Sequence, residues 1–459
     1  MNAFCIESPA PVRHGEKEAA RWRRLAIIWA LYYLISWTVG QDVQTVQKII
    51  WGGAALVGAA SIPVFVRNRV WQNLPAEGIC LCLFSAWTAT GFFIAQNDAM
   101  FWLQFRQVAE LALIVLFVSI VLRHSAGAGW FFGAFLLVST IKVALGNEPM
   151  SLAQLQVETR IASANTLGFH CYMGLVGMFG LWGKTERLWA RILLLSGGLI
   201  AMYGVVLSAS RGALVVTMVL VVLWVLFCQV ASSRVKMAGI LGAVLILYGG
   251  HVLFRFVIRD TYMGKRFMQS TQLEDSSSRT RLELFNTGWD MFLSRPLFGC
   301  GIGQFGSASG LGYNTHNEMV EIAATTGLPG LVLYYSAFLM AWRRLTRSIR
   351  RLGQPEDRYQ INVARIALLT LFISGAIFRP NFLSQNSMFM LGVVAGVAQW
   401  AEAKARTALW RQPGLEPSNQ PAFGVLPAGE PWPTPRFRAV GFSEPAPQSP
   451  SVSRPASPC

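Results

Sequence analysis

The chain has 459 residues, of which 53% are hydrophobic and only 14% are charged. Soluble domains usually carry about 25% charged residues, so this composition excludes an ordinary soluble protein and indicates a membrane protein. The net charge of +16 does not point to a nucleic-acid partner. Most of the excess is arginine in short segments between apolar runs, where membrane proteins use it to set their orientation.

Roughly 20 apolar residues in a helix cross a hydrocarbon core about 30 Å thick, and such runs recur along most of the chain. They predict an all-α polytopic membrane protein with about twelve transmembrane helices. Nine spans are expected within residues 25–255, at about 25–40, 49–66, 77–95, 107–122, 126–145, 166–183, 189–207, 212–231 and 237–255. Three more are expected within residues 327–402, at about 327–342, 361–378 and 387–402.

The basic residues predict the orientation of these spans. If residues 1–24 are cytoplasmic, the loops on that side hold most of the Lys and Arg, as the positive-inside rule requires. An odd number of spans then precedes residue 256, which places one large loop, 256–326, on the non-cytoplasmic side between the ninth and tenth spans. In a bacterium this loop is periplasmic and the protein lies in the inner membrane. Residues 403–459, rich in Pro and Ser, are expected to form a disordered cytoplasmic tail.

The segment Ser208-Ala209-Ser210-Arg211-Gly212 lies between two predicted spans on the external side. Ser210 is placed to cap the helix that begins near Arg211. A cation at a helix N-terminus is locally unfavourable. An anionic ligand held by the guanidinium and the backbone N–H groups would remove this conflict. The alternative is an arginine that extends to the membrane interface.

A capped helix in the external loop is predicted by Thr280 and Glu283. Its apolar stripe consists of Leu282, Phe285, Trp289 and Phe292. Arg281 borders this stripe, whereas Arg279 lies on the polar face, where it could pair with Glu283. Arg281 is therefore the better candidate to point into a cleft.

His316 is the histidine that falls in the polar part of the external loop. Thr315 and Glu318 form a capping-box pattern, which predicts a helix with His316 in its first turn, ending near Thr326 before Gly327. The positive end of the helix dipole disfavours an imidazolium ion, and a general base must be a neutral imidazole at pH 7. The alternative is an ordinary surface histidine at a helix cap.

Three external helix starts thus carry a cationic or titratable residue, which indicates a site for a multiply charged anion together with one base. Asp and Glu show no metal-site spacing, and no Gly-rich nucleotide loop is visible, so we expect neither a metal nor a cofactor. Glu110 is a further candidate, because it lies within an apolar run.

Three motifs stand in this order between about residues 207 and 335. The first is Ser208-Ala209-Ser210-Arg211-Gly212-Ala213-Leu214. The second is Arg281-Leu282-Glu283-Leu284-Phe285, followed by Ser294-Arg295-Pro296-Leu297-Phe298-Gly299-Cys300-Gly301. The third is His316-Asn317-Glu318-Met319-Val320-Glu321-Ile322-Ala323, ending in Thr326-Gly327-Leu328-Pro329-Gly330-Leu331. In combination they resemble the O-antigen ligase and polymerase superfamily, and the long loop before the tenth span matches as well.

The resemblance implies a glycosyltransferase that moves a glycan from undecaprenyl diphosphate to an acceptor hydroxyl at the periplasmic face, without metal or nucleotide. It matches Arg211 and Arg281 to arginines that hold the diphosphate, and His316 to the base. The second of these cations has three open alternatives, namely Arg279, Lys265 and Arg266. The further candidate substrate-binding residues are Arg279, Ser210, Asn317 and Arg160.

Three functions stay open. The first is a ligase that transfers the glycan to lipid A–core or a similar acceptor, and the motifs favour it. The second is a polymerase that extends a growing glycan on the same carrier with the same diphosphate chemistry. The third is a transporter or flippase without catalysis, although such a protein would more often show internal repeats and buried charge near mid-membrane. Membrane lipids are partners in each case.

Overall fold

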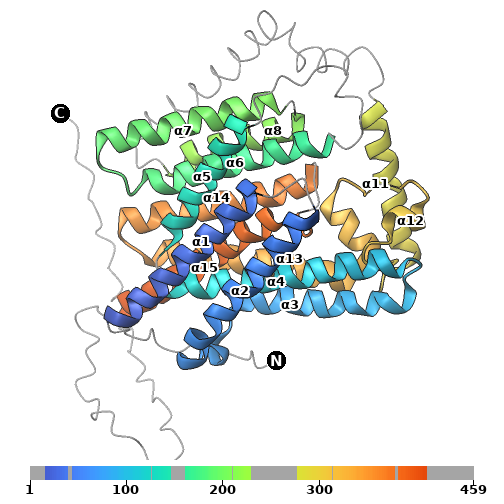
Figure 1. Cartoon of the computed structure of the whole chain (residues 1–459), viewed down its shortest axis with the longest axis horizontal. Coiled ribbons are helices and arrows are strands. Elements are labelled where there is room, and N and C mark those ends of the chain that lie inside the picture. The colour runs from blue at the N-terminus through green and yellow to red at the C-terminus, as the bar shows by residue number, and fades with distance from the viewer. Residues whose placement is uncertain are drawn as a thin grey trace, which may run out of the picture. The chain divides into compact units, whose positions relative to one another are not determined.

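The computed structural model describes residues 16–39, 44–125, 127–145, 161–208, 210–228, 276–312, 314–377 and 381–410, and all regular elements in these ranges are helices (Figure 1). The first half contains α1 Glu16–Val39, α2 Gln44–Arg67, η1 Val70–Asn73, α3 Ala76–Thr88, η2 Ala89–Ile94, α4 Asp98–Ser125, α5 Ala128–Leu145, α6 Ile161–Trp182, α7 Leu188–Leu207 and α8 Arg211–Cys228. The second half contains α11 Ser276–Ser294, α12 Phe305–Ser309, α13 Glu318–Arg351, α14 Pro355–Ile377 and α15 Gln385–Trp410.

Seven of the described helical segments are long and apolar enough to cross a membrane, which agrees with the multi-pass expectation. They are Ala76–Ile94, Asp98–Ser125, Ala128–Leu145, Leu188–Leu207, Arg211–Cys228, Glu318–Arg351 and Pro355–Ile377. Each predicted span coincides with a described helix, except 237–255, which lies outside the described residues. The total of about twelve spans stays a prediction.

Several helices extend beyond the apolar run that predicted them. α1 begins at Glu16, inside the segment assigned to a cytoplasmic N-terminus. α15 continues to Trp410, so the first residues of the predicted tail are helical. Hydropathy marks only the part of a helix that is uniformly apolar, and amphipathic turns at its ends go undetected. Residues 411–459, most of the predicted tail, lie outside the described residues.

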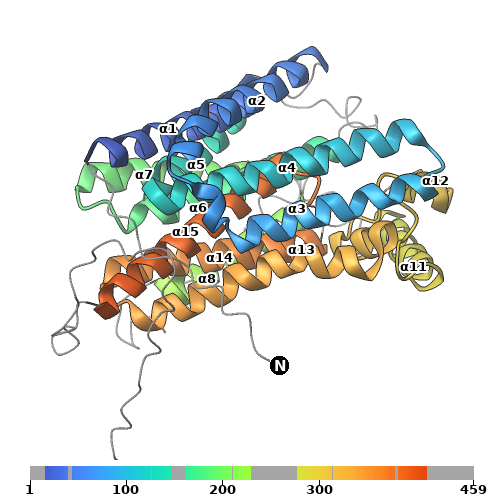
Figure 2. The same cartoon turned by 90° about the horizontal axis from the view of Figure 1, so that it is seen from below.

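α13 is a central helix of the bundle, because it packs against α3, α14, α15 and α11. Figure 2 shows α1 and α2 along the opposite side of the helix bundle. Elsewhere small residues bring helices close together. A Cβ at Gly177 of α6 would lie 2.3 Å from the carbonyl oxygen of Phe132 in α5. Such small-residue contacts are typical of membrane helices, whose association depends on close packing.

Two ionisable residues lie in apolar runs of the sequence, and each has a side-chain partner in the structure. His170 is buried, stacks edge-on against Trp37 at 4.5 Å between ring centroids, and lies within hydrogen-bond distance of Asn386. Glu110 is paired with Arg106 through a 2.8 Å contact, and 36% of its side chain is exposed. Glu110 is therefore only partly buried and has Arg106 as its partner, and its functional role stays a prediction.

Candidate functional site

The first two turns of α13 form a short helix that ends at a sharp break. Gly327 has φ 70° and ψ −171°, a conformation that non-glycine residues rarely adopt. The break leaves the carbonyl groups of the short helix without helical partners. Those of Ala324 and Thr325 accept from the backbone N–H of Cys300 and Gly301, both at 2.9 Å. The predicted stop of this helix at Gly327 is confirmed.

The loop that supplies these hydrogen bonds is itself fixed to another part of the bundle. The buried side chain of Gln304 accepts from the backbone N–H of Gln96 and Asn97 and donates to the Asn97 carbonyl, at 2.8 to 3.0 Å. The indole N–H of Trp87 donates to the Thr326 carbonyl at 2.8 Å. The short helix at the start of α13 is therefore held at its C-terminal end by α3 and by the 295–304 loop.

Asn317, and not Thr315, caps the N-terminus of α13. The Asn317 side-chain oxygen accepts from the backbone N–H of Val320 at 3.1 Å. Its side-chain nitrogen donates to the carbonyl of Ala376 at the end of α14, at 2.9 Å. The backbone N–H of Thr315 donates instead to the Glu321 carboxylate at 2.7 Å. The predicted capping box of Thr315 and Glu318 is wrong, because Glu321 takes the acidic role one turn later.

Glu318 anchors the N-terminus of α13 to the segment that precedes α15. Its carboxylate is fully buried. It accepts from the backbone N–H groups of Asn381 and Phe382 and from the Tyr335 hydroxyl. A carboxylate at the first turn of a helix also interacts favourably with the helix dipole. Both ends of the short helix are thus fixed by side chains and loops distant in sequence.

His316 lies immediately before this cap, outside the helix, with a left-handed φ of 56°. Its side chain is partly buried. Burial lowers the pKa of His316 below its ordinary value of 6.5, because it disfavours the charged imidazolium, and the positive charge of Arg281 lowers the pKa further. His316 is therefore a neutral imidazole at pH 7, able to accept a proton.

Arg281 reaches this site from the face of α11 that packs on α13. α11 begins at Ser276, so Thr280 lies inside the helix and is not its cap. The buried positions Leu284 and Gly288 follow Arg281 by three and seven residues, which places all three on one helical face. Arg281 is partly buried, whereas Arg279 is exposed.

Gly288 permits the close approach of α11 to α13. A Cβ at this position would lie 2.5 Å from Val320 and 3.1 Å from Thr315. The predicted apolar stripe does not form the contact, because Leu282, Phe285 and Trp289 are 60%, 40% and 46% exposed. The contact face was misassigned because a small residue, and not the largest apolar ones, permits this approach.

Ser210 and Arg211 begin α8 as the sequence predicted. The Ser210 hydroxyl accepts from the backbone N–H of Ala213 at 3.3 Å, and Arg211, the first helical residue, is partly buried. α8 packs against α14, and the side chain of Asn362 near the start of α14 donates to the Phe227 carbonyl at the end of α8. The two helices therefore run in opposite directions. Arg211 accordingly lies at the same end of the bundle as His316.

One comparison with known proteins matches part of the chain. Residues 197–335 match the family described as O-Antigen ligase. The chain therefore carries an O-antigen ligase segment. The resemblance to the O-antigen ligase and polymerase superfamily is confirmed. No curated protein matches the chain.

The O-antigen ligase segment includes most of the predicted site residues. The described ones within it are Ser210, Arg211, Arg279, Arg281, His316 and Asn317. Lys265 and Arg266 fall in the segment but outside the described residues, and Arg160 lies outside both. Among the described residues, Arg281 is close enough to His316 for its charge to lower the imidazole pKa. Arg279 stays on the exposed face of α11, and Arg211 lies at the same end of the bundle as His316.

Sequence reasoning missed the residues of the O-antigen ligase segment that hold the site together. Glu318 stood inside a recognised motif, but its partners Asn381 and Phe382 are 63 and 64 residues away and carry no local signal. Gln304 follows Gly301 and Gly303. A polar residue in such a glycine-rich turn is the sequence pattern that could have indicated a side chain fixing the loop.

Proposed function

We propose that the chain is a membrane glycosyltransferase that moves a glycan from undecaprenyl diphosphate to an acceptor hydroxyl at the non-cytoplasmic face of the bacterial inner membrane. The observation that carries the proposal is the neutral, partly buried His316 beside Arg281, at the start of α13 in the O-antigen ligase segment. A base next to a cation suits a reaction in which a hydroxyl loses its proton while a diphosphate leaves.

The proposed step is a direct displacement. His316 takes the proton of the acceptor hydroxyl, whose oxygen attacks the anomeric carbon of the donor glycan. The bond from that carbon to the bridging phosphate oxygen breaks, and its electron pair departs with the diphosphate. Arg281 and Arg211 neutralise the charge that grows on the bridging oxygen. The products are the glycoside, with inverted configuration, and undecaprenyl diphosphate, and the proton on His316 returns to solvent.

Asn317 and Ser210 support this machinery through the backbone. Both polar atoms of the Asn317 amide are engaged, one by Val320 and one by Ala376. This arrangement fits a residue that positions His316 better than one that binds substrate. Ser210 similarly orders the first turn of α8, whose N-terminus and Arg211 would face the diphosphate.

Ligase-type transfer to lipid A–core or a similar acceptor is the form that we propose, because the matched family is described as O-Antigen ligase. The polymerase alternative uses the same donor site and differs only in the acceptor. Transfer without catalysis, as in a flippase, would give His316 no chemical role.

The test is the profile of surface polysaccharide and lipid-linked glycan in a strain lacking the gene. The strain is complemented with the wild type, His316→Ala or Arg211→Ala, and with His124→Ala as a control histidine that stacks on Trp22. A ligase predicts long glycan stranded on the lipid carrier and bare lipid A–core for the first two variants, and normal glycan for the control. Single repeat units on lipid A–core would identify a polymerase. Full complementation by His316→Ala and Arg211→Ala would refute catalysis at this site.

A further inference from the structure

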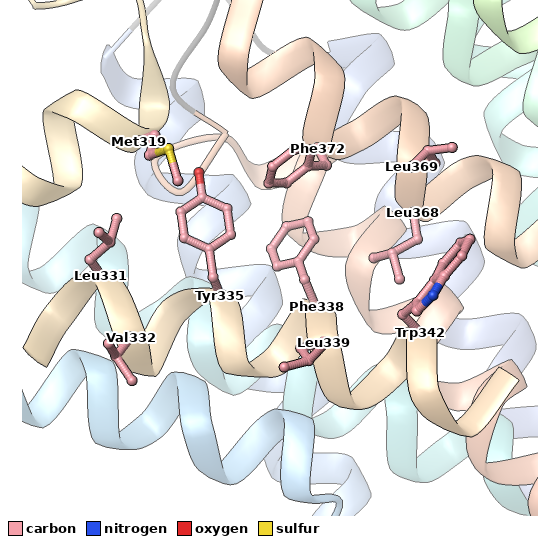
Figure 3. Close-up of a pocket in the computed structure, with 10 residues that line it drawn as sticks. All are labelled: Met319, Leu331, Val332, Tyr335, Phe338, Leu339, Trp342, Leu368, Leu369 and Phe372. Carbon is pink, nitrogen blue, oxygen red and sulfur yellow. The ribbon is translucent and has the colours of Figure 1, made fainter. Parts of the chain in front are cut away.

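An apolar groove of about 430 Å³ runs between α13 and α14 (Figure 3). Its lining side chains include Tyr335, Phe338, Leu339, Trp342, Leu369 and Phe372. Leu339 and Phe372 are 47% and 40% exposed, so the groove opens to the outside of the bundle. Because α13 and α14 are both long and apolar enough to cross a membrane, this outside is the hydrocarbon of the bilayer. A lipid chain can therefore enter the groove sideways from the membrane.

The groove has the length of a lipid chain in one leaflet. The lining residues of α13 from Leu331 to Trp342 cover about 16 Å at 1.5 Å per residue, which is about half of a hydrocarbon core. Apart from the Tyr335 hydroxyl and the Trp342 indole nitrogen, the lining side chains carry no oxygen or nitrogen. One acyl chain of a phospholipid therefore suits the groove in both length and polarity.

The two ends of the groove differ in charge. At the end nearer the start of α13, the Tyr335 hydroxyl donates to the buried carboxylate of Glu318. At the other end, the guanidinium of Arg365 lies over the Trp342 ring, 4.6 Å from its centroid. Arg365 precedes the lining residue Leu369 by four positions, which places both on one face of α14. The groove lining thus contacts a carboxylate at one end and a cation at the other, so an anionic head group is favoured beside Arg365.

Arg365 has no carboxylate partner among the described residues. Its Nε atom is buried without a hydrogen-bond partner, and one Nη atom donates to the Asn362 side-chain oxygen at 3.4 Å. The guanidinium also lies 5.9 Å from the ring centroid of Phe227 at the end of α8. The positive charge of Arg350, in the last turn of α13, acts on Arg365 as well. Arg365 is only partly buried, so an anion from the bilayer can reach it and balance these two cations.

We propose that this groove and Arg365 form a binding site for an anionic diacyl phospholipid. One acyl chain lies in the groove between α13 and α14, and the phosphate lies beside the Arg365 guanidinium. Basic pockets between membrane helices bind such head groups on the cytoplasmic side, where the predicted orientation places Arg365. The proposed diphosphate position, at His316 and Arg281, is at the opposite end of the bundle. The inference therefore goes beyond the proposed function and does not depend on it.

The experiment measures lipid binding to the full-length protein in detergent by native mass spectrometry. The probes are dioleoyl phosphatidylglycerol and dioleoyl phosphatidylcholine, which have the same chains and differ in net charge. We expect the wild type to prefer phosphatidylglycerol by about tenfold, the effect of one charge-assisted contact. Arg365→Gln should remove most of this preference. Arg365→Lys keeps the positive charge and should retain most of it.

Matched controls separate this site from the other basic and apolar surfaces. Arg347→Gln removes an exposed cation that lies about 140° around α13 from Trp342, and should leave the preference unchanged. Leu369→Trp fills the groove and should weaken the binding of both lipids about equally, because less apolar surface is buried. Leu199→Trp, at a 70% exposed position on α7, should weaken the binding of neither lipid.

Two outcomes would overturn the inference. Equal loss of preference in Arg365→Gln and Arg347→Gln would mean that the arginines attract anionic lipid without a defined site. Displacement of bound phosphatidylglycerol by undecaprenyl diphosphate at equal concentration would mean that a different lipid occupies the groove.

A second readout uses the wild-type protein, so a misfolded variant does not stop the test. The probe is phosphatidylglycerol with a photoreactive group on one acyl chain. Its cross-links should map to residues 331–342 and 368–372, and cross-links confined to other helices would refute the groove.

Discussion

His316 is kept neutral by two causes that mutations can separate. Burial is the larger and Arg281 the smaller. A base acts only when unprotonated, so activity should fall as the pH drops through the pKa of His316, which lies below 6.5. Removing the positive charge of Arg281 removes one cause of the lowering, so the pKa must rise toward 6.5.

The Arg281→Gln variant should therefore lose activity at a higher pH than the wild type does. Its rate at pH 8 should also fall, by about a hundredfold, because a donor to the developing negative charge is missing. The measurement is the pH dependence of glycan transfer by the purified protein. Arg279→Gln is the control, since Arg279 lies two residues away on the exposed face of α11. A shift with Arg279→Gln and none with Arg281→Gln would reverse the assignment of the second cation.

At the scale of single residues, the sequence located residues at helix starts but did not predict how they are capped and buried. His316, Arg211 and Ser210 could be singled out because a titratable or cationic residue beside a helix start is a local pattern. The true cap at Asn317 was missed because Thr315 also fits a capping box, and only the tertiary contact of Asn317 with Ala376 distinguishes them. Burial of His316, the main cause of its lowered pKa, is not readable from neighbouring residues.

Among the helices, α11 matters because it carries Arg281 and packs closely against the start of α13. Gly288 lies at that contact, with no room for a side chain beside Val320. Gly288→Val should push α11 away, at a cost of about 1 to 3 kcal/mol of overpacking. The separation of Arg281 from His316 should then lower activity by about tenfold or more.

The Gly288→Val prediction is checked by transfer activity together with thermal denaturation in detergent. Asn286→Val introduces the same β-branched residue on the exposed side of α11 and controls for its lower helix propensity. Activity equal to wild type in Gly288→Val would mean that the α11–α13 contact does not position Arg281.

The elements themselves followed from hydropathy, since a helix that crosses hydrocarbon must be both long and apolar. The orientation of α11 did not follow, because apolar residues were assumed to face the protein. In a membrane protein an apolar helix surface can face lipid instead of another helix. Small residues then decide which faces of the helices pack against each other. Leu282 and Gly288 illustrate the two cases, the first 60% exposed and the second buried.

Across the whole molecule, α13 separates two chemically different ends. His316 and the buried Glu318 lie at its N-terminal end, and its last turns carry Arg343, Arg344, Arg347, Arg350 and Arg351. Arg344 lies 3.3 Å from Glu77 of α3 and 3.5 Å from Glu402 of α15, so it joins three helices at that end. The arginines thus contribute to packing as well as to the charge asymmetry that predicts a cytoplasmic location.

This asymmetry leads to a labelling prediction in intact cells. A cysteine introduced at Ser307, an exposed position near the candidate site, should react with a membrane-impermeant maleimide added from outside. A cysteine at Glu356, exposed at the start of α14, should react only after the membrane is permeabilised. The parent chain is the background, in which Cys300 should stay unlabelled because burial raises the pKa of its thiol to about 12. The opposite result, in which Glu356→Cys is labelled from outside and Ser307→Cys is not, would place His316 on the cytoplasmic side. A glycan donor on the other side of the membrane could not reach His316 there.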